Sequence, residues 1–179
     1  MTSMVQNTSD YLAQANAKVA ANLPNTNAFA LPKIEKVCIN IGVGKYENKE
    51  IAQIATFLEK LSGQKPKLVA SKMNVAGFKL RAGKVVGVIV TLRKTKALDL
   101  ILNLIHLALP RARDFKGIKK GFNANYSSYS LGIENAGIFP QVGFDNEINF
   151  GMQVNIVFKD ANKNNVMLLE NMKFPFINE

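Results

Sequence analysis

The side chains with the clearest chemical potential in this sequence are cations lying between residues 65 and 96. That stretch holds nine Lys or Arg residues and no Asp or Glu. Strand-forming residues (VVGVIVTL) and a glycine-punctuated segment (AGFKLRAGK) are interleaved with the positive charges, so the cations belong to folded structure and not to a disordered tail. A one-signed field of this kind is typical of proteins that bind a polyanion. A solvated basic face kept for solubility is the alternative.

The charge is concentrated in one part of the chain. Residues 31–122 contain 19 Lys or Arg and 6 Asp or Glu, whereas the remaining residues contain 4 and 7, within an overall net charge of +10. The chain has no Trp and no segment that combines a basic face with an exposed apolar face. Nucleic acid is therefore a better candidate partner than a membrane surface.

The sequence has few residues that could form a nucleotide-binding, catalytic or metal-binding site. The segment INIGVGKYENK resembles a phosphate-binding loop, but Ile39 stands where the first glycine is needed and Tyr46 where the Ser or Thr is needed. The one histidine, His106, lies in an apolar segment that predicts a core or interface role. With one His, one Cys and scattered acids, we expect no catalytic site, no metal and no cofactor, and hence no enzyme.

Helical and strand patterns interleave along the chain, with some strands adjacent in sequence. We expect helices over 9–22, 48–62, 95–109 and 160–172, and strands over 33–43, 67–70, 84–93, 126–133 and 152–159. Gly63 should end the second helix, Thr95 should cap the third, and Pro110 should terminate it. The strand over 33–43 shows a slip near Glu35. Residues 71–83 and 111–125 should be a loop and an irregular basic segment.

This order favours an α+β fold over a doubly wound sheet. The 179 residues, 47% of them hydrophobic, suit one compact domain made of an N-terminal helix and turn (1–30) and an α+β core (31–179). The single cysteine, Cys38, fits a reducing compartment. We expect a cytoplasmic protein, and a protein made and used inside an organelle would have the same composition.

RNA is favoured over DNA because no expected helix has a basic face for a major groove. The cations lie on strands, strand ends and loops, together with small polar and aromatic residues that suit folded RNA. The polar residues are Asn40, Gln64, Ser71, Asn74 and Thr91, and the loop aromatics are Phe78, Phe115 and Phe122. Each aromatic could equally fill the core. We expect Phe78 to be exposed.

A series of segments carries a resemblance to a known family. In order these are PKIEKVCINIGVG, SGQKP, VAGFKLRAG, VTLR, ALPRARDFKG, YSLGI, IFP and FPF, covering about Leu31 to Phe176. The series resembles the bacterial ribosomal protein L-five family, the large-subunit proteins that hold 5S rRNA in the central protuberance. The resemblance implies an antiparallel sheet with helices packed on one side, in a single domain.

The resemblance also implies two RNA contacts. Strand ends of the sheet would bind 5S rRNA through Asn40, Gln64, Thr91 and Arg93, and we add the neighbouring cations Lys65, Lys67 and Lys94 to this site. The loop VAGFKLRAG would approach the P-site tRNA. Its expected contact residues are Asn74, Gly77, Phe78, Lys79 and Arg81.

The implied role is a structural constituent of the large ribosomal subunit. Its partners would be 5S rRNA, large-subunit rRNA, P-site tRNA and a small-subunit protein across the subunit interface. An RNA chaperone or translation factor with the same basic sheet is the alternative. The chain departs from the family pattern within 122–150, where, for example, an expected Arg is Glu134 and another is Phe150, so contacts made by that segment are less certain to be kept.

Overall fold

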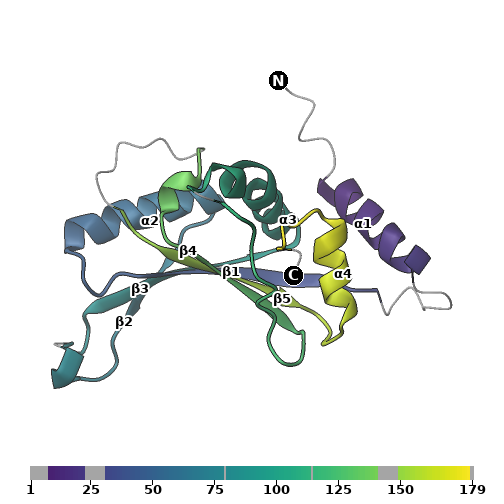
Figure 1. Cartoon of the computed structure of the whole chain (residues 1–179). Helices are drawn as coiled ribbons and strands as arrows, with labels where there is room; N and C mark the ends of the chain where they lie inside the picture. Colours follow the sequence, from purple (N-terminus) through teal and green to yellow (C-terminus); the bar gives the residue numbers. More distant parts are fainter. Residues whose placement is uncertain (1–7, 23–30, 79, 114, 141–148, 178–179) are drawn as a thin grey trace.

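The computed structural model describes residues 8–22, 31–78, 80–113, 115–140 and 149–177 (Figure 1). Nine helices and strands lie within these ranges, joined by short 3-10 and π turns. In chain order they are α1 (Thr8–Asn22), β1 (Ile34–Gly42), α2 (Asn48–Ser62), β2 (Lys67–Ala70), β3 (Val85–Arg93), α3 (Lys94–Asn103), β4 (Ser128–Ile133), β5 (Met152–Phe158) and α4 (Asn164–Asn171).

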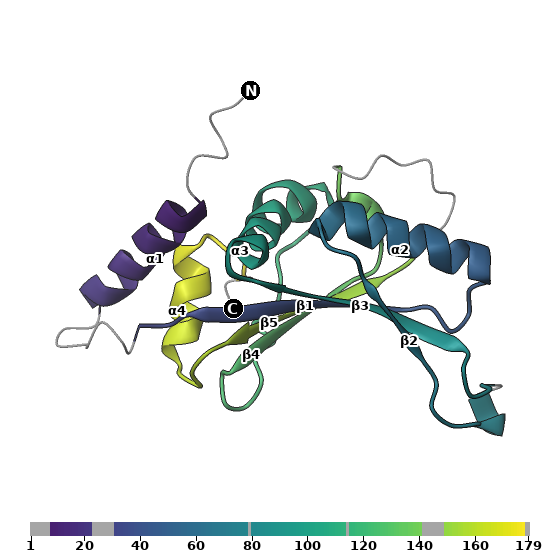
Figure 2. The same cartoon turned by 180° about the vertical axis from the view of Figure 1, so that it is seen from behind.

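The strands form one five-stranded sheet in the order β2-β3-β1-β5-β4, and every neighbouring pair is antiparallel. This confirms the expected α+β class. Figures 1 and 2 show α2 and α3 lying across one face of the sheet, with α1 beside α4 near one end. The described helices therefore leave the opposite face of the sheet uncovered.

Alternation along the strands explains why one face is covered and the other is not. Val37, Ile39 and Ile41 of β1 are fully buried and join the apolar face of α2 in the core. The residues between them point the other way. We call that side the open face; it carries Lys36, Cys38, Asn40 and Gly42 of β1, Gly87, Ile89, Thr91 and Arg93 of β3, Gln153, Asn155 and Val157 of β5, and Ser128, Ser130 and Gly132 of β4.

Several local expectations are confirmed in detail. Helix α2 spans Asn48–Ser62 as predicted, and Gly63 ends it with a φ of 60°, the left-handed conformation that glycine adopts most readily. The register of β1 against β5 shifts between Ile34 and Lys36, which is where the alternation slips in the sequence. Strand β2 has the predicted bounds.

The ends of other elements differ from the predictions. Helix α3 begins at Lys94 with Arg93 as its N-cap, so Thr95 lies inside the helix and does not cap it. The helical path also continues past Asn103 through a π turn and a 3-10 turn that contains Pro110 and ends at Arg111. Proline is tolerated there because the first turn of a helical segment leaves its N–H groups unpaired in any case.

The later elements are shorter than predicted. Strand β4 starts at Ser128 and not at 126, because Tyr126 has a φ of 55°, which is incompatible with a strand. Helix α4 starts at Asn164 and not at 160, since residues before it form turns closed by bonds such as Asn165 N–H to the Asn162 carbonyl. None of the described helices has the length and apolar character needed to cross a membrane.

Candidate nucleic-acid interface

The open face presents side chains in rows that run across four strands. In one row Thr91 of β3 lies opposite Cys38 of β1. Cys38 in turn lies opposite Asn155 of β5, and Asn155 lies opposite Ser130 of β4. The Cys38 Sγ and Thr91 Oγ1 atoms are 3.7 Å apart. This row consists of hydroxyl, thiol and amide groups. These side chains can contact a ligand through hydrogen bonds, and none of them is a Lys, Arg, Asp or Glu.

The next row places a cation at the sheet edge. Lys67 of β2 lies opposite Ile89 of β3, Ile89 opposite Asn40 of β1, and Asn40 opposite Gln153 of β5. Lys67 and Gln153 are exposed, and Asn40 is half-buried. In this row the positive charge therefore lies at the β2 edge, while β1 and β5 carry amides.

The structure brings the predicted 5S rRNA residues to one part of this face. The Gln64 side-chain Nε2 donates a hydrogen bond to the Thr91 main-chain carbonyl 3.4 Å away, so the turn after α2 is tied to β3. Lys65 lies just before β2, and Lys94 directly after β3. Asn40 stands one row away from Thr91 on β1.

Arg93 shares its end of the sheet with an acidic residue. Its Nη1 atom lies 3.4 Å from the Glu35 Oε1 atom, and the Lys36 Nζ atom lies 3.9 Å from the same oxygen. All three side chains are substantially exposed, so these ion pairs add little stability. A phosphate can therefore displace Glu35 from Arg93 at small free-energy cost.

The cations between residues 65 and 96 do not all have the same role. The Lys84 Nζ donates a hydrogen bond to the Gly44 carbonyl at 2.9 Å. The Lys96 Nζ donates one at 2.8 Å to the carbonyl of Gly63, the residue that directly follows α2. These two lysines stabilise loops. The exposed side chains of Lys65, Lys67 and Lys94 have no ion pair or hydrogen bond within the described part of the chain.

The loop predicted to contact tRNA joins β2 to β3 and projects beyond the ends of these two strands (Figure 1). Val75 and Leu80 exchange two backbone hydrogen bonds of 3.0 and 3.1 Å, and Ala76–Phe78 form a 3-10 turn between them. The Asn74 Oδ1 accepts from the Ala82 N–H at 2.7 Å. This oxygen of Asn74, a predicted tRNA contact, is thus already used to hold the loop.

The other loop residues predicted to contact tRNA are either exposed or outside the described part of the chain. Gly77 and Arg81 are exposed. Lys79 lies outside the described residues, and so does the Phe78 side chain, whose predicted exposure therefore stays a prediction. Met73, which was not predicted to take part, is 71% exposed and stands at the base of the same projection.

Phe115 and Phe122, two of the loop aromatics considered for RNA stacking, are partly buried and pack against the core. Phe122 is partly buried and packs against several aromatic side chains at the core. Its neighbours are Tyr126, Tyr129, Phe158 and Phe176, with ring centroids 5.0 to 6.3 Å away. His106 is exposed and meets the Tyr11 ring of α1 edge-on at 6.0 Å. It therefore lies at a contact between α1 and the π turn after α3.

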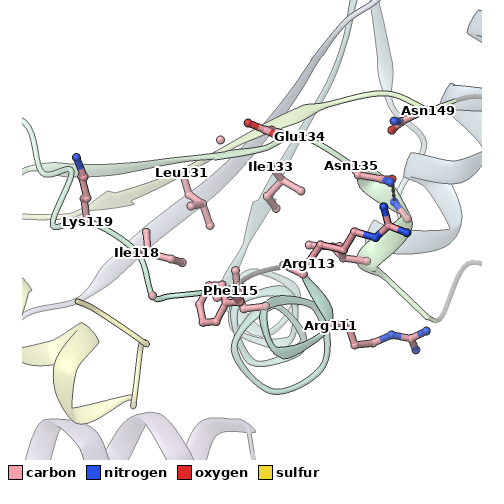
Figure 3. A pocket seen from close by; sticks show the side chains of 16 residues that line it. Arg111, Arg113, Phe115, Ile118, Lys119, Leu131, Ile133, Glu134, Asn135 and Asn149 are labelled. Carbon is pink, nitrogen blue, oxygen red and sulfur yellow. Dashed lines mark hydrogen bonds between the residues drawn. The ribbon is translucent and has the colours of Figure 1, made fainter. Parts of the chain in front are cut away.

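A separate cavity lies on the helix side of the sheet, with a volume of about 850 Å³ (Figure 3). Phe115, Ile118, Leu131 and Ile133 lie together along one side of it, and Arg113 points toward Asn135. Figure 3 also shows Glu134 on the other side of β4 from Phe115. The basic segment that follows α3 therefore does not belong to the open face.

The described residues hold no cluster of three or more His, Cys, Asp or Glu side chains that could bind a metal ion. Burial raises the pKa of Tyr129 far above its ordinary value, and its hydroxyl donates to the Lys119 carbonyl at 3.2 Å. That phenol is neutral and structural. The side chains on the open face are suited to binding and contain no paired acid and base.

Sequence reasoning missed the half of the open face formed by β4 and β5. Ser130, Gln153 and Asn155 continue the rows begun by Thr91 and Asn40. The alternation in MQVNIVF did identify which side of β5 is polar. It did not reveal that β5 lies beside β1.

Comparisons with known proteins point to one family. Residues 27–81 match the family model "Ribosomal protein L5", and residues 85–176 match the model for the C-terminus of the same ribosomal family. Similar proteins named "Large ribosomal subunit protein uL5" occur in Mycoplasma mycoides subsp. mycoides SC (41% identical), Mycoplasma capricolum subsp. capricolum (41%) and Helicobacter pylori strain P12 (36%). Each similarity spans 170 residues, 93% of this chain and 94% of the relative.

The fold is an antiparallel α+β sheet with helices on one face and a polar open face on the other (Figure 1), which is an architecture suited to binding. The matches extend over nearly the whole chain and include strands from both halves of the sheet. The chain belongs to the ribosomal protein L5 family. It is accordingly a structural ribosomal protein and a component of ribonucleoprotein.

Proposed function

We propose that the protein assembles into the large ribosomal subunit and binds 5S rRNA with the open face of its sheet. The observation that carries this proposal is the convergence of Gln64, Thr91 and Asn40 with unpaired cations on a sheet face that no described helix covers. Family membership supplies the ribosomal setting. The residues supply the surface on which an RNA backbone can lie.

The mechanism divides binding between charge and hydrogen bonds. Lys65, Lys67, Arg93 and Lys94 neutralise phosphates along the β2–β3 edge, and the released counterions make binding dependent on salt. Asn40, Thr91 and Gln64 then fix the register through neutral hydrogen bonds to sugar, phosphate or base atoms. The cations at one side of the sheet therefore bind the RNA backbone, and the short polar side chains nearer the middle of the open face add hydrogen bonds.

The projecting loop is the proposed second contact, with P-site tRNA. Its tip stands away from the rows of the open face, so it can reach a partner that the sheet does not touch (Figure 1). Asn74 stabilises the loop, while Gly77 and Arg81 are exposed for contact and Phe78 and Lys79 complete the predicted set. Contacts with large-subunit rRNA and with a small-subunit protein belong to the same proposal.

Two measurements test the proposed function. Purified protein should bind 5S rRNA in a filter assay, and the Lys65→Gln, Lys67→Gln double variant should bind more weakly. Lys18→Gln with Lys60→Gln is the matched control, because both lysines are exposed on helices. In addition, the protein should stay on large subunits washed at high salt. Release by that wash would instead indicate an RNA chaperone or translation factor.

A further inference from the structure

A hollow of about 430 Å³ opens on the open face where β1, β5 and β4 lie side by side. Its lining includes three glycines from these strands and their flanks, two amides and one carboxylate. They are Gly42, Gly132, Gly151, Asn40, Gln153 and Glu134. Asn40 lies opposite Gln153, and Gln153 lies opposite Gly132, so the amides and glycines are direct neighbours across the strands.

Two of these glycines are not explained by the fold itself. Neither Gly42 nor Gly132 has a positive φ, and a Cβ atom added to either would meet nothing within 4 Å. Gly151 differs, because a Cβ there would lie 3.1 Å from the Ile133 carbonyl oxygen. Glycine weakens a strand interior and often marks a place where a ligand approaches closely. Gly42 and Gly132 leave room for something outside the chain.

The groups around the hollow determine what can enter it. The Asn40 and Gln153 amides form no hydrogen bond within the described residues, so each can both donate and accept. Glu134 is the one charged residue among those described that line the hollow, and it is exposed. Its carboxylate repels a phosphate group. A neutral, flat partner with hydrogen-bond donors on its edge suits this site better than the RNA backbone does.

We propose that this hollow binds the base of one unstacked guanosine in the RNA that is bound to the open face. Guanine is the RNA base whose pairing edge presents two adjacent donors, N1–H and N2–H, and a carboxylate can accept both at once. The Gln153 or Asn40 amide then donates to the guanine O6. Adenine, cytosine and uracil each lack this pair of ring and amino donors. This inference rests on the proposed binding of 5S rRNA and adds base recognition to it.

The test combines affinity with a chemical footprint on 5S rRNA. Kethoxal adds to N1 and N2 of unpaired guanines, so a guanine held by Glu134 should be protected in the complex. Glu134→Gln should expose that guanine and weaken binding about tenfold, because a bidentate contact to a base is worth about one to two orders of magnitude in discrimination. Gly132→Val, whose Cβ would meet no protein atom within 4 Å and whose side chain would occupy the hollow, should have the same two effects.

The control is Glu59→Gln, the same change of charge at an exposed site on α2. It should leave the footprint unchanged and should not weaken binding. If Glu134→Gln binds 5S rRNA equally or more tightly and no guanine changes its kethoxal reactivity, the carboxylate merely repels phosphate and the inference is overturned, while RNA binding by the sheet stands. If the wild-type protein does not bind 5S rRNA, both the proposed function and this inference fail.

Discussion

The side-chain amide nitrogen of Gln64 lies 3.4 Å from the main-chain carbonyl oxygen of Thr91 and donates a hydrogen bond to it. The two residues are 27 positions apart, in the turn after α2 and in β3. This bond uses one amide hydrogen of Gln64 and leaves its oxygen and second hydrogen for a partner. Gln64 therefore positions β3, and in the proposed interface its remaining amide groups would face the same RNA as Thr91.

We expect the Gln64→Ala, Thr91→Ala double variant to bind 5S rRNA more weakly and to remain folded. Each lost hydrogen bond to RNA removes about 1 kcal/mol, or about fivefold in affinity. The bond between Gln64 and Thr91 is long and exposed, so the free energy of unfolding should change little. Filter binding at moderate salt measures the affinity. Gln53→Ala with Thr56→Ala, on exposed positions of α2, should bind like wild type. Equal affinities of the two double variants would show that Gln64 and Thr91 do not contact the RNA.

Lys94, a proposed RNA contact, also has a strained backbone conformation. Its φ of 54° lies in the left-handed region, which costs a residue with a side chain about 1–2 kcal/mol. Lys94→Gly should therefore raise the free energy of unfolding by about 0.5–1 kcal/mol, after the entropy of glycine is subtracted. It should also flatten the plot of log affinity against log salt by roughly 0.7–0.9, one phosphate contact.

Lys94→Gln separates the two effects, because it removes the charge and keeps the strain. It should reproduce the smaller salt slope without the gain in stability. Chemical denaturation and salt titration are the two measurements. An unchanged slope in both variants would mean that the Lys94 ammonium group is only solvated.

The projecting loop should be dispensable for binding 5S rRNA. We expect deletion of residues 75–82, closed with a short Gly-Ser linker, to leave affinity for 5S rRNA near normal and to weaken retention of P-site tRNA on mutant ribosomes. The stem should survive, because the Ser71 N–H to Lys84 carbonyl and Gly83 N–H to Ser71 carbonyl bonds lie outside the deletion. Loss of 5S rRNA binding in a folded deletion variant would place the loop in the first site.

Buried Tyr129 should make the fold sensitive to alkaline pH. Burial raises the pKa of its phenol above the ordinary value of 10.0, so the folded protein binds this proton more tightly than the unfolded chain does. The stability that depends on the proton is complete below pH 10 and is lost as pH rises above it. Tyr129→Phe should remove this part of the decline in the free energy of unfolding. It should cost about 1 kcal/mol at neutral pH, through the lost bond to the Lys119 carbonyl. Identical alkaline profiles of the two proteins would contradict this assignment.

Local patterns predicted the elements better than they predicted their neighbours. The alternation around Asn40 and Thr91 correctly placed both residues on a polar strand face, since period two is a property of a single strand. The order β2-β3-β1-β5-β4 depends on long-range packing, and it alone brings Gln153 and Asn155 beside β1. For that reason the sequence indicated the half of the open face formed by β1 and β3 and missed the half formed by β5 and β4.

The ends of elements were mispredicted where tertiary contacts outweigh local preference. Thr95 is a good capping residue by type, but the turn into α3 is made one residue earlier by Lys94 with its positive φ. Phe122 sits in a loop of small polar residues, and the sequence left both a core role and an RNA-stacking role open for it. Only the folded chain shows Tyr129 and Phe158 packed around it.

The central claim, that RNA covers the open face, is tested most directly at Cys38, the one cysteine of the chain. Its Sγ lies 3.7 Å from the Thr91 Oγ1 in the middle of that face. We would measure the rate at which a maleimide modifies Cys38 with and without saturating 5S rRNA. A Cys38→Ser, Ala13→Cys protein, labelled on the exposed side of α1, serves as the control. The account predicts at least tenfold protection of Cys38 and none at position 13. Equal labelling of Cys38 in free and RNA-bound protein would contradict it.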